Sequence, residues 1–205
     1  MLKGVEPSVK LECVPKFCYL GDTLGAGGGV EEAARARVRF AWAKFKELSP
    51  ILTAWGASYH IKGKIYKACV QSVLTYGTET WAMKKANLHS LERAEQMMVR
   101  WMCGASLKDR KRSVDLYSLL GVQSMAEVVR RGRLRWFGHV ERKSGDDWVS
   151  ACRNVVVAGV RCVGRGRKTR RECVKDDMVE LGLHPEWAVS DMWRGFISRR
   201  TSNPS

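Results

Sequence analysis

Residues 30–50 read VEEAARARVRFAWAKFKELSP, and this pattern indicates one amphipathic helix. Apolar residues recur every three or four positions, which places them on one face of a helix. They are Val30, Ala34, Val38, Ala41, Trp42, Phe45 and Leu48. We expect Ser49 and Pro50 to end this helix, because proline lacks the backbone N–H that continues it.

The residues before this helix predict a β-hairpin. Residues 9–13 alternate between apolar and polar side chains, and Phe17–Leu20 forms a second apolar run. We expect the turn between the two strands at Pro15 and Lys16. Glycine-rich residues 25–29 then end the strand pattern and lead into the helix.

The residues after this helix predict further helices. A helical period continues from about residue 60 to 76, with Ile61 and Ile65 on its buried face and the lysines at 62, 64 and 67 facing elsewhere. Two capping boxes, in which an N-cap side chain and a glutamate three residues later each accept the other's backbone N–H, mark the starts of two later helices. They are Ser124 with Glu127, and Thr169 with Glu172. The predicted fold is mainly α: a helical bundle with a short N-terminal β-hairpin and a basic helical C-terminal extension.

The chain divides into three predicted regions. Residues 1–24 form the hairpin, residues 25–122 form a helical domain, and residues 123–205 form the basic extension. Of the 205 residues, 45% are hydrophobic, which is enough apolar material to form a buried core. Full-length disorder is therefore excluded.

Positive charge is the strongest compositional signal. The chain holds 36 Lys and Arg against 21 Asp and Glu, so its formal net charge is +15. Five of the eight residues 164–171 are basic. Clustered charge of this kind favours a polyanionic partner, because each neutralised phosphate releases counterions. The alternative is a basic surface with no partner. An anionic membrane is disfavoured, because no segment joins a basic face to a long apolar one.

The sequence shows no catalytic or metal-binding constellation. Seven Cys and four His are scattered without the close pairs of a zinc site, and the glycine run 25–29 lacks the third glycine of a dinucleotide-binding fingerprint. The acidic pairs 146–147 and 176–177 are expected to be solvated. We expect no catalytic residue, no metal and no cofactor. No apolar run is long enough to span a membrane and no signal core is present, so the expected location is the nucleus or cytoplasm.

Basic clusters and aromatic rings are the candidate nucleic-acid contacts, because cations contact phosphates and rings stack on bases. The basic candidates are Lys62, Lys64, Lys67, Lys108, Arg110, Lys111, Arg112, Arg130, Arg131, Arg133, Arg135, Arg165, Arg167, Lys168, Arg170 and Arg171. His139 and the aromatic residues Phe17, Tyr19, Trp136 and Phe137 are the other candidates. Each cluster alone could equally be a solvated face.

Several blocks resemble the C-terminal region of LINE-type (non-LTR) retrotransposon reverse transcriptases. They read FCYLG at 17–21, GKIYKACV at 63–70, LTYGTETW at 74–81 and RLRWFGHV at 133–140. The resemblance runs from about Val9 to Ile197, in the order of the family. A rear motif departs from the family pattern, because Gly166 stands in place of a proline and Arg170 in place of a tryptophan.

The resemblance implies the end of a polymerase palm, a thumb and a C-terminal extension. Residues 17–21, including Leu20 and Gly21, look like the primer-grip hairpin, and the helices to about 104 look like the thumb that tracks the template-primer duplex. The implied partner is RNA, DNA or their hybrid, bound without sequence preference. The family's catalytic aspartates, and the Mg²⁺ they bind, belong to a palm that precedes these residues. We therefore expect a nucleic-acid-binding remnant that is inactive alone, with a separate palm-bearing chain as a further candidate partner. The alternative is a free-standing basic adaptor that binds RNA or a protein.

Overall fold

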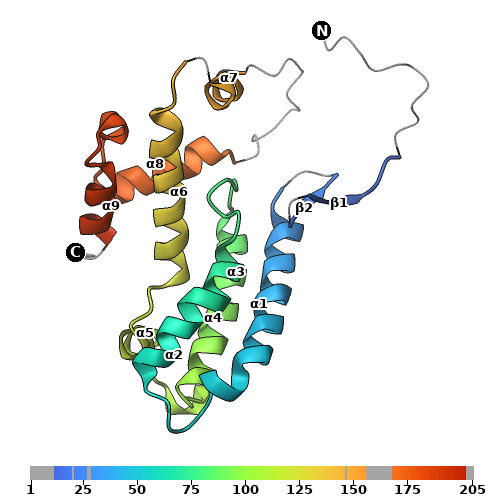
Figure 1. Cartoon of the computed structure of the whole chain (residues 1–205), viewed down its shortest axis with the longest axis vertical. Coiled ribbons are helices and arrows are strands. Elements are labelled where there is room, and N and C mark those ends of the chain that lie inside the picture. Colours follow the sequence, from blue (N-terminus) through green and yellow to red (C-terminus); the bar gives the residue numbers. More distant parts are fainter. Residues whose placement is uncertain (1–11, 20, 27–28, 146, 156–167, 202–205) are drawn as a thin grey trace.

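The computed structural model describes residues 12–19, 21–26, 29–145, 147–155 and 168–201 (Figure 1). Within these residues the fold is mainly helical with a two-stranded antiparallel hairpin near the N-terminus, as predicted. The strands are β1 (Lys16–Tyr19) and β2 (Asp22–Gly25). The α-helices are α1 (Glu31–Leu52), α2 (Tyr59–Tyr66), α3 (Ser72–Thr75), α4 (Lys85–Met102), α5 (Ser113–Leu120), α6 (Met125–Glu141), α7 (Trp148–Asn154), α8 (Arg170–Leu181) and α9 (Trp193–Thr201). A π-helical segment η1 (Lys67–Gln71) joins α2 to α3, and two short 3-10 helices are η2 (Leu107–Asp109) and η3 (Pro185–Val189).

The hairpin lies later in the sequence than predicted. Tyr19 pairs with Asp22, so the chain reverses between these two residues. The predicted turn at Pro15 and Lys16 is wrong. Gly21 has a φ of +78°, a left-handed conformation that glycine adopts without steric cost and that suits a two-residue hairpin turn. The alternating residues 9–11 lie outside the described residues.

Polar contacts hold the hairpin against α1 and the loop after α3. The Arg37 guanidinium donates to the Gly21 carbonyl and lies over the ring of Tyr76, 4.4 Å from its centroid. Trp81 Nε1 donates to Asp22 Oδ2 at 3.2 Å. All four side chains of β1 are exposed, so the hairpin contributes little to the apolar core. Figure 1 shows it beside the N-terminal end of α1.

The first helix runs past its predicted end. It continues to Leu52, two residues beyond Pro50. Proline cannot donate a hydrogen bond to the carbonyl of Lys46, four residues earlier. Ser49 Oγ donates to that carbonyl at 2.8 Å instead. The carbonyl is therefore satisfied, and the helix accommodates proline in its last turn.

The second predicted helix exists, but its buried face is rotated from the prediction. Lys62 is only 4% exposed, whereas Ile61 is 52% exposed. Gly63 sets this rotation, because a Cβ at that position would overlap the backbone carbonyl of Leu120 on α5. The Lys62 ammonium donates to the Met102 carbonyl at 3.2 Å, which satisfies the buried charge in part.

Helix α6 joins two clusters of buried apolar side chains. The first cluster gathers residues of α1 to α6, and the second gathers residues of α6, α8, α9 and the segments beside them. Met125 and Val129 pack in the first cluster, and Leu134 packs in the second. In Figure 1, α8 crosses α6, and α9 lies on the side of α6 away from α1. The division of the chain at residues 122 and 123 stays a prediction.

A buried carboxylate links α6 to the first cluster. Glu95 on α4 accepts hydrogen bonds from Gln71 Nε2 at 2.9 Å, Tyr117 Oη at 3.2 Å and the backbone N–H of Met125 at 2.7 Å. Burial raises the pKa of Glu95 from 4.5 to about 7, although these hydrogen bonds act in the opposite direction. The carboxylate therefore ties the start of α6 to three other elements.

Glu95→Gln should change how stability depends on pH. Between pH 4.5 and 7 the folded chain keeps a proton on Glu95 that the unfolded chain has lost. The contribution of Glu95 to stability is thus fully present below pH 4.5 and falls as pH rises to 7, by about 3 kcal/mol. Urea unfolding of both proteins at pH 5 and pH 8 measures this change. The free energy of unfolding of the wild type should fall relative to that of the variant at the higher pH. A constant difference between them would contradict the raised pKa.

Two glycines in α6 provide a matched pair of packing variants. A Cβ at Gly138 would overlap the buried indole ring of Trp193 on α9, whereas a Cβ at Gly132 would meet no atom within 4 Å. Gly138→Ala should therefore lower the free energy of unfolding by about 1–3 kcal/mol through overpacking. Gly132→Ala should raise it by about 0.5–1 kcal/mol, because alanine favours the helix. Thermal unfolding of the two variants checks this, and equal shifts would speak against the α6–α9 packing.

Candidate nucleic-acid interface

The four α6 arginines that were predicted as one cluster lie on two sides of the helix. Arg130 and Arg133 face α8, whereas Arg135 is exposed and Arg131 is half-buried. Residues two apart in a helix point in nearly opposite directions, so Arg133 and Arg135 cannot share a face. The sequence cluster is therefore two separate sets of charges.

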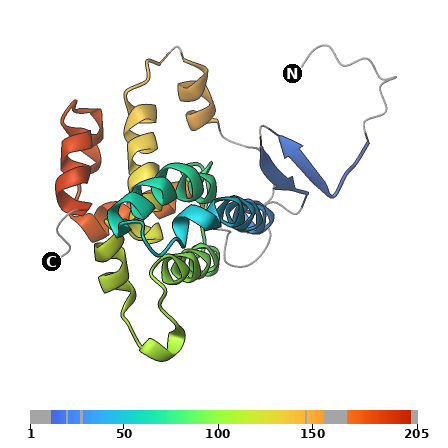
Figure 2. The same cartoon turned by 60° about the horizontal axis from the view of Figure 1, so that its bottom comes forward.

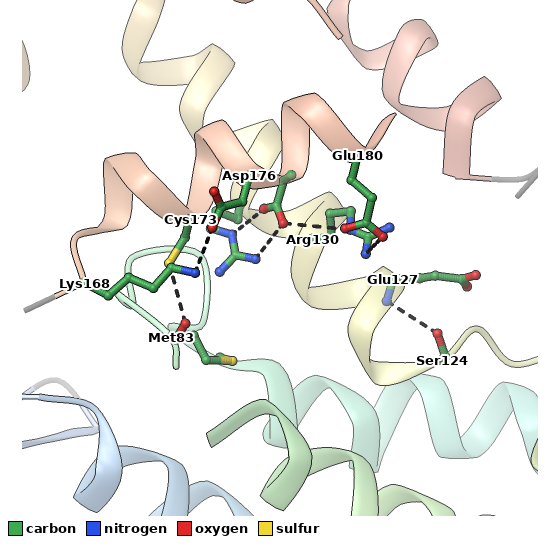
Figure 3. Close-up of polar contacts among 10 residues, drawn as sticks. Met83, Ser124, Glu127, Arg130, Lys168, Cys173, Asp176 and Glu180 are labelled. Carbon is green, nitrogen blue, oxygen red and sulfur yellow. Dashed lines mark hydrogen bonds and ion pairs between the residues drawn. The ribbon is translucent and has the colours of Figure 1, made fainter. Parts of the chain in front are cut away.

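Carboxylates of α8 form ion pairs with Arg130 and Arg133. Arg133 is 7% exposed and forms a bidentate ion pair with Asp177, with Nε–Oδ2 at 2.6 Å and Nη2–Oδ1 at 3.0 Å. Arg130 Nη2 lies 2.6 Å from Glu180 Oε1 (Figure 3). Burial raises the pKa of Asp177, and the charge of Arg133 opposes that rise. These arginines hold α8 against α6, and we leave them out of the candidate interface.

The adjacent acidic residues Asp176 and Asp177 have different roles. Asp176 is exposed, as expected, but the expectation that Asp177 is solvated is wrong. Val174 and Met178, three residues before and one after Asp177, are both buried with it. Helical spacing therefore places Asp177 on the apolar side of α8, a pattern that was present in the sequence.

The other side of α6 carries two arginines and His139, with the half-buried Trp136 at its edge. We call Arg131, Arg135, Trp136 and His139 the outer face of α6. Arg135 and His139 are exposed, and Arg131 Nη1 donates to Gln123 Oε1 at 2.7 Å. Burial and the nearby charge of Arg135 lower the pKa of Arg131, so the two guanidinium groups lie within electrostatic range. The rings of Trp136 and His139 are 5.3 Å apart at 30°.

The start of α8 is fixed by the predicted capping box. The Thr169 side chain accepts from the Glu172 backbone N–H at 3.2 Å, and Glu172 Oε2 accepts from the Thr169 N–H at 2.7 Å. Lys168, just before the helix, pairs with Asp176 at 2.8 Å (Figure 3). This lysine therefore has an acidic partner within the fold.

The other basic candidates near α8 differ in how exposed they are to solvent. Arg170 is partly buried, and its Nε donates to the Glu79 carbonyl at 3.0 Å. Burial lowers the pKa of Arg170, with Arg133 acting in the same direction. Arg171 is exposed. Arg165 and Arg167 lie outside the described residues, so their place in an interface stays a prediction.

The remaining basic candidates lie on α2, at the start of η1 and in the segment between α4 and α5. Lys64 and Lys67 are exposed, and Lys67 Nζ donates to the Gly121 carbonyl at 3.2 Å. The candidates in the α4–α5 segment are all exposed, namely Lys108, Arg110, Lys111 and Arg112. Lys62, by contrast, is buried and engaged with Met102, so we leave it out of the candidate interface.

Two aromatic rings lie side by side on the hairpin. Phe17 and Tyr19 are 56% and 57% exposed, and their ring centroids are 6.4 Å apart at 23°. Alternate residues of a strand share a face, which explains their contact. Leu20 lies outside the described residues, and Gly21 forms the turn. A stacking role for the two rings stays a prediction.

The described residues offer neither a cluster of metal ligands nor a helix that could span a membrane. Among them, no group of three or more His, Cys, Asp or Glu is placed so that it could hold a metal ion. In the same part of the chain, no helix has the length and apolar character needed to cross a bilayer.

Asp177→Ala should destabilise the fold strongly. It leaves the buried Arg133 guanidinium without its carboxylate, a loss that costs about 3–5 kcal/mol in comparable buried pairs. Asp176→Ala is the matched control, because it removes an exposed carboxylate from the neighbouring position and should leave the unfolding midpoint unchanged. Urea unfolding of both variants tests the assignment. Equal losses in the two variants would show that Asp177 has no special role.

The chain is similar to an uncharacterized protein of Caenorhabditis elegans that is described as transposon-derived. The two are 26% identical over 147 residues. The matched region covers 70% of this chain and 52% of the relative, so the chain spans about half the length of that protein. No protein-family model and no solved structure matches the chain. The similarity supports an origin in a transposable element.

Proposed function

We propose that this chain is the thumb and C-terminal region of a LINE-type retrotransposon reverse transcriptase and binds nucleic acid along the outer face of α6. The similarity to a transposon-derived protein supports the origin, and the four quoted sequence blocks support the reverse-transcriptase assignment. The proposed ligand is a template-primer of RNA, DNA or their hybrid. The proposed role is binding, because the family's catalytic aspartates belong to the palm.

The division of the α6 arginines carries this proposal. Arg131 and Arg135 lie one turn apart, and like charges at this spacing destabilise a helix. Glu127, one turn before Arg131, offsets part of the repulsion. The fold neutralises Arg130 and Arg133 with carboxylates of α8, whereas the charge of Arg135 acts on Arg131. An anionic ligand on this face would relieve the remaining repulsion.

The chemistry of this face suits contact with the nucleic-acid backbone. Guanidinium groups form bidentate hydrogen bonds with phosphate, and these contacts carry no sequence information. His139 lies one helical turn after Arg135, and its ring and the ring of Trp136 offer planar surfaces for stacking. Both kinds of contact tolerate any base, which fits a protein that follows a template-primer.

Removing the two outer arginines should weaken binding to a labelled RNA/DNA hybrid. Arg131→Gln with Arg135→Gln should lower the affinity at low salt by about tenfold or more and reduce the slope of log affinity against log salt by about 1–2. Duplex DNA and single-stranded RNA should show similar losses, because the contacts are to phosphates.

The matched control removes the same charge elsewhere. Lys46→Gln with Arg93→Gln changes two exposed basic residues of α1 and α4. This control should bind nearly as well as the wild type. Equal losses in the two double variants would mean that only net charge matters, and no binding by the wild type at low salt would overturn the proposed function.

A further inference from the structure

The segment between α4 and α5 stands away from the helical bundle, as Figure 2 shows at the end of α4. We call residues Ser106–Arg112 the tip loop. It contains the 3-10 helix η2 and four basic residues. Leu107 is 81% exposed, so the loop does not pack into the core.

A network of side chain to backbone hydrogen bonds fixes the shape of the tip loop. Asp109 Oδ2 accepts from the Ser106 backbone N–H at 2.7 Å, and the Ser106 side chain accepts from the Asp109 N–H. The Arg100 guanidinium, on α4, donates to the Ser106 carbonyl at 3.3 Å and to the Lys111 carbonyl at 2.9 Å. One planar group thus bridges the two ends of the loop.

Arg110 has an unfavourable backbone conformation for its residue type. Its φ is +49° and its ψ is +22°, and among the described residues it is the non-glycine residue with a positive φ. Glycine or asparagine adopts this conformation at lower cost than arginine. Strained residues that persist in a well-fixed segment often mark a functional site. An arginine at this position points to a role for its side chain.

The charges of the tip loop are unequally satisfied within the fold. Arg112 makes a bidentate pair with Asp115, at 3.0 Å and 2.9 Å. The hydrogen bond from Ser106 lowers the pKa of Asp109, and the charge of Lys111 acts in the same direction. The described contacts give Lys108 and Arg110 no acidic partner of their own, and both are exposed. The loop therefore presents a local excess of positive charge in a fixed geometry.

We infer that the tip loop is a second, preformed phosphate-binding site, and that Arg100 is the residue that positions it. This inference rests on the proposed function, because the ligand is the backbone of the nucleic acid that binds α6. Lys108, Arg110 and Lys111 contact phosphates. Because the Arg100 bridge already holds the loop in shape, little binding free energy is lost in ordering it. Nucleic acid is favoured over an anionic membrane because Leu107 is the one apolar side chain among the seven residues of the loop.

The sharpest test keeps the charge of the chain constant. Arg100→Lys retains the positive charge, but one ammonium cannot hold both carbonyl groups with the fixed spacing of a guanidinium. Binding of the full chain to the labelled RNA/DNA hybrid should weaken by about three- to tenfold, and amide hydrogen exchange in the loop should become faster. Arg93→Lys, the control at an exposed arginine of the same helix, should change neither quantity.

A second pair of variants removes the contacts themselves. Arg110→Gly relieves the backbone conformation, so it should not lower stability, yet it should weaken binding. Lys108→Gln with Lys111→Gln should lower the salt slope by about 1–2. Wild-type affinity in both of these variants would overturn the inference.

The outcomes separate this inference from the proposed function. If the wild type binds and the α6 variant is weakened while the loop variants bind normally, only the tip-loop site is wrong. If the wild type does not bind, the proposed function has failed as well. Loop variants that lose binding to phosphatidylserine vesicles but keep their affinity for the hybrid would overturn the inference in favour of a membrane contact.

Discussion

The buried ion pair between Arg133 and Asp177 determines how the rear half of the molecule is arranged. Two charges are removed from water, and they are tolerated because the guanidinium and the carboxylate meet in bidentate geometry. This contact fixes the rotation of α6 about its own axis. Once Arg133 faces α8, the helical period places Arg131 and Arg135 on the opposite side. The candidate interface is thus a consequence of the internal pair.

Two further contacts hold α6 along its length. At its start, the Glu95 carboxylate accepts the Met125 N–H, one of the backbone groups that have no partner within the helix. Farther along, Gly138 allows the Trp193 indole to approach, and Trp193 Nε1 donates to the Leu134 carbonyl at 2.9 Å. The helix that carries the outer arginines is therefore held rigidly by both apolar clusters. A rigid element suits contact with a regularly spaced phosphate backbone.

Local chemistry explains which parts of this fold could be predicted from the sequence. The capping box at Thr169 and the N-cap at Ser124 involve residues three apart, so the sequence alone indicates them, although only the Ser124 half of the box predicted with Glu127 is present. The hairpin was expected but misplaced, because the turn chemistry of Gly21 outweighed that of Pro15. The burial of Lys62 depends on contact between Gly63 and Leu120, which are far apart in the sequence. Likewise, helical spacing could have separated the α6 arginines into two sets, but only the position of α8 shows which set is internal.

The most direct test of this account is an NMR titration that observes arginine side-chain Nε–Hε groups as an RNA/DNA hybrid is added. The account predicts that the signals of Arg131 and Arg135 shift on binding, whereas the signal of Arg133, held by Asp177, stays in place. Binding that leaves the Arg131 and Arg135 signals unchanged would contradict the claim that the outer face of α6 contacts nucleic acid.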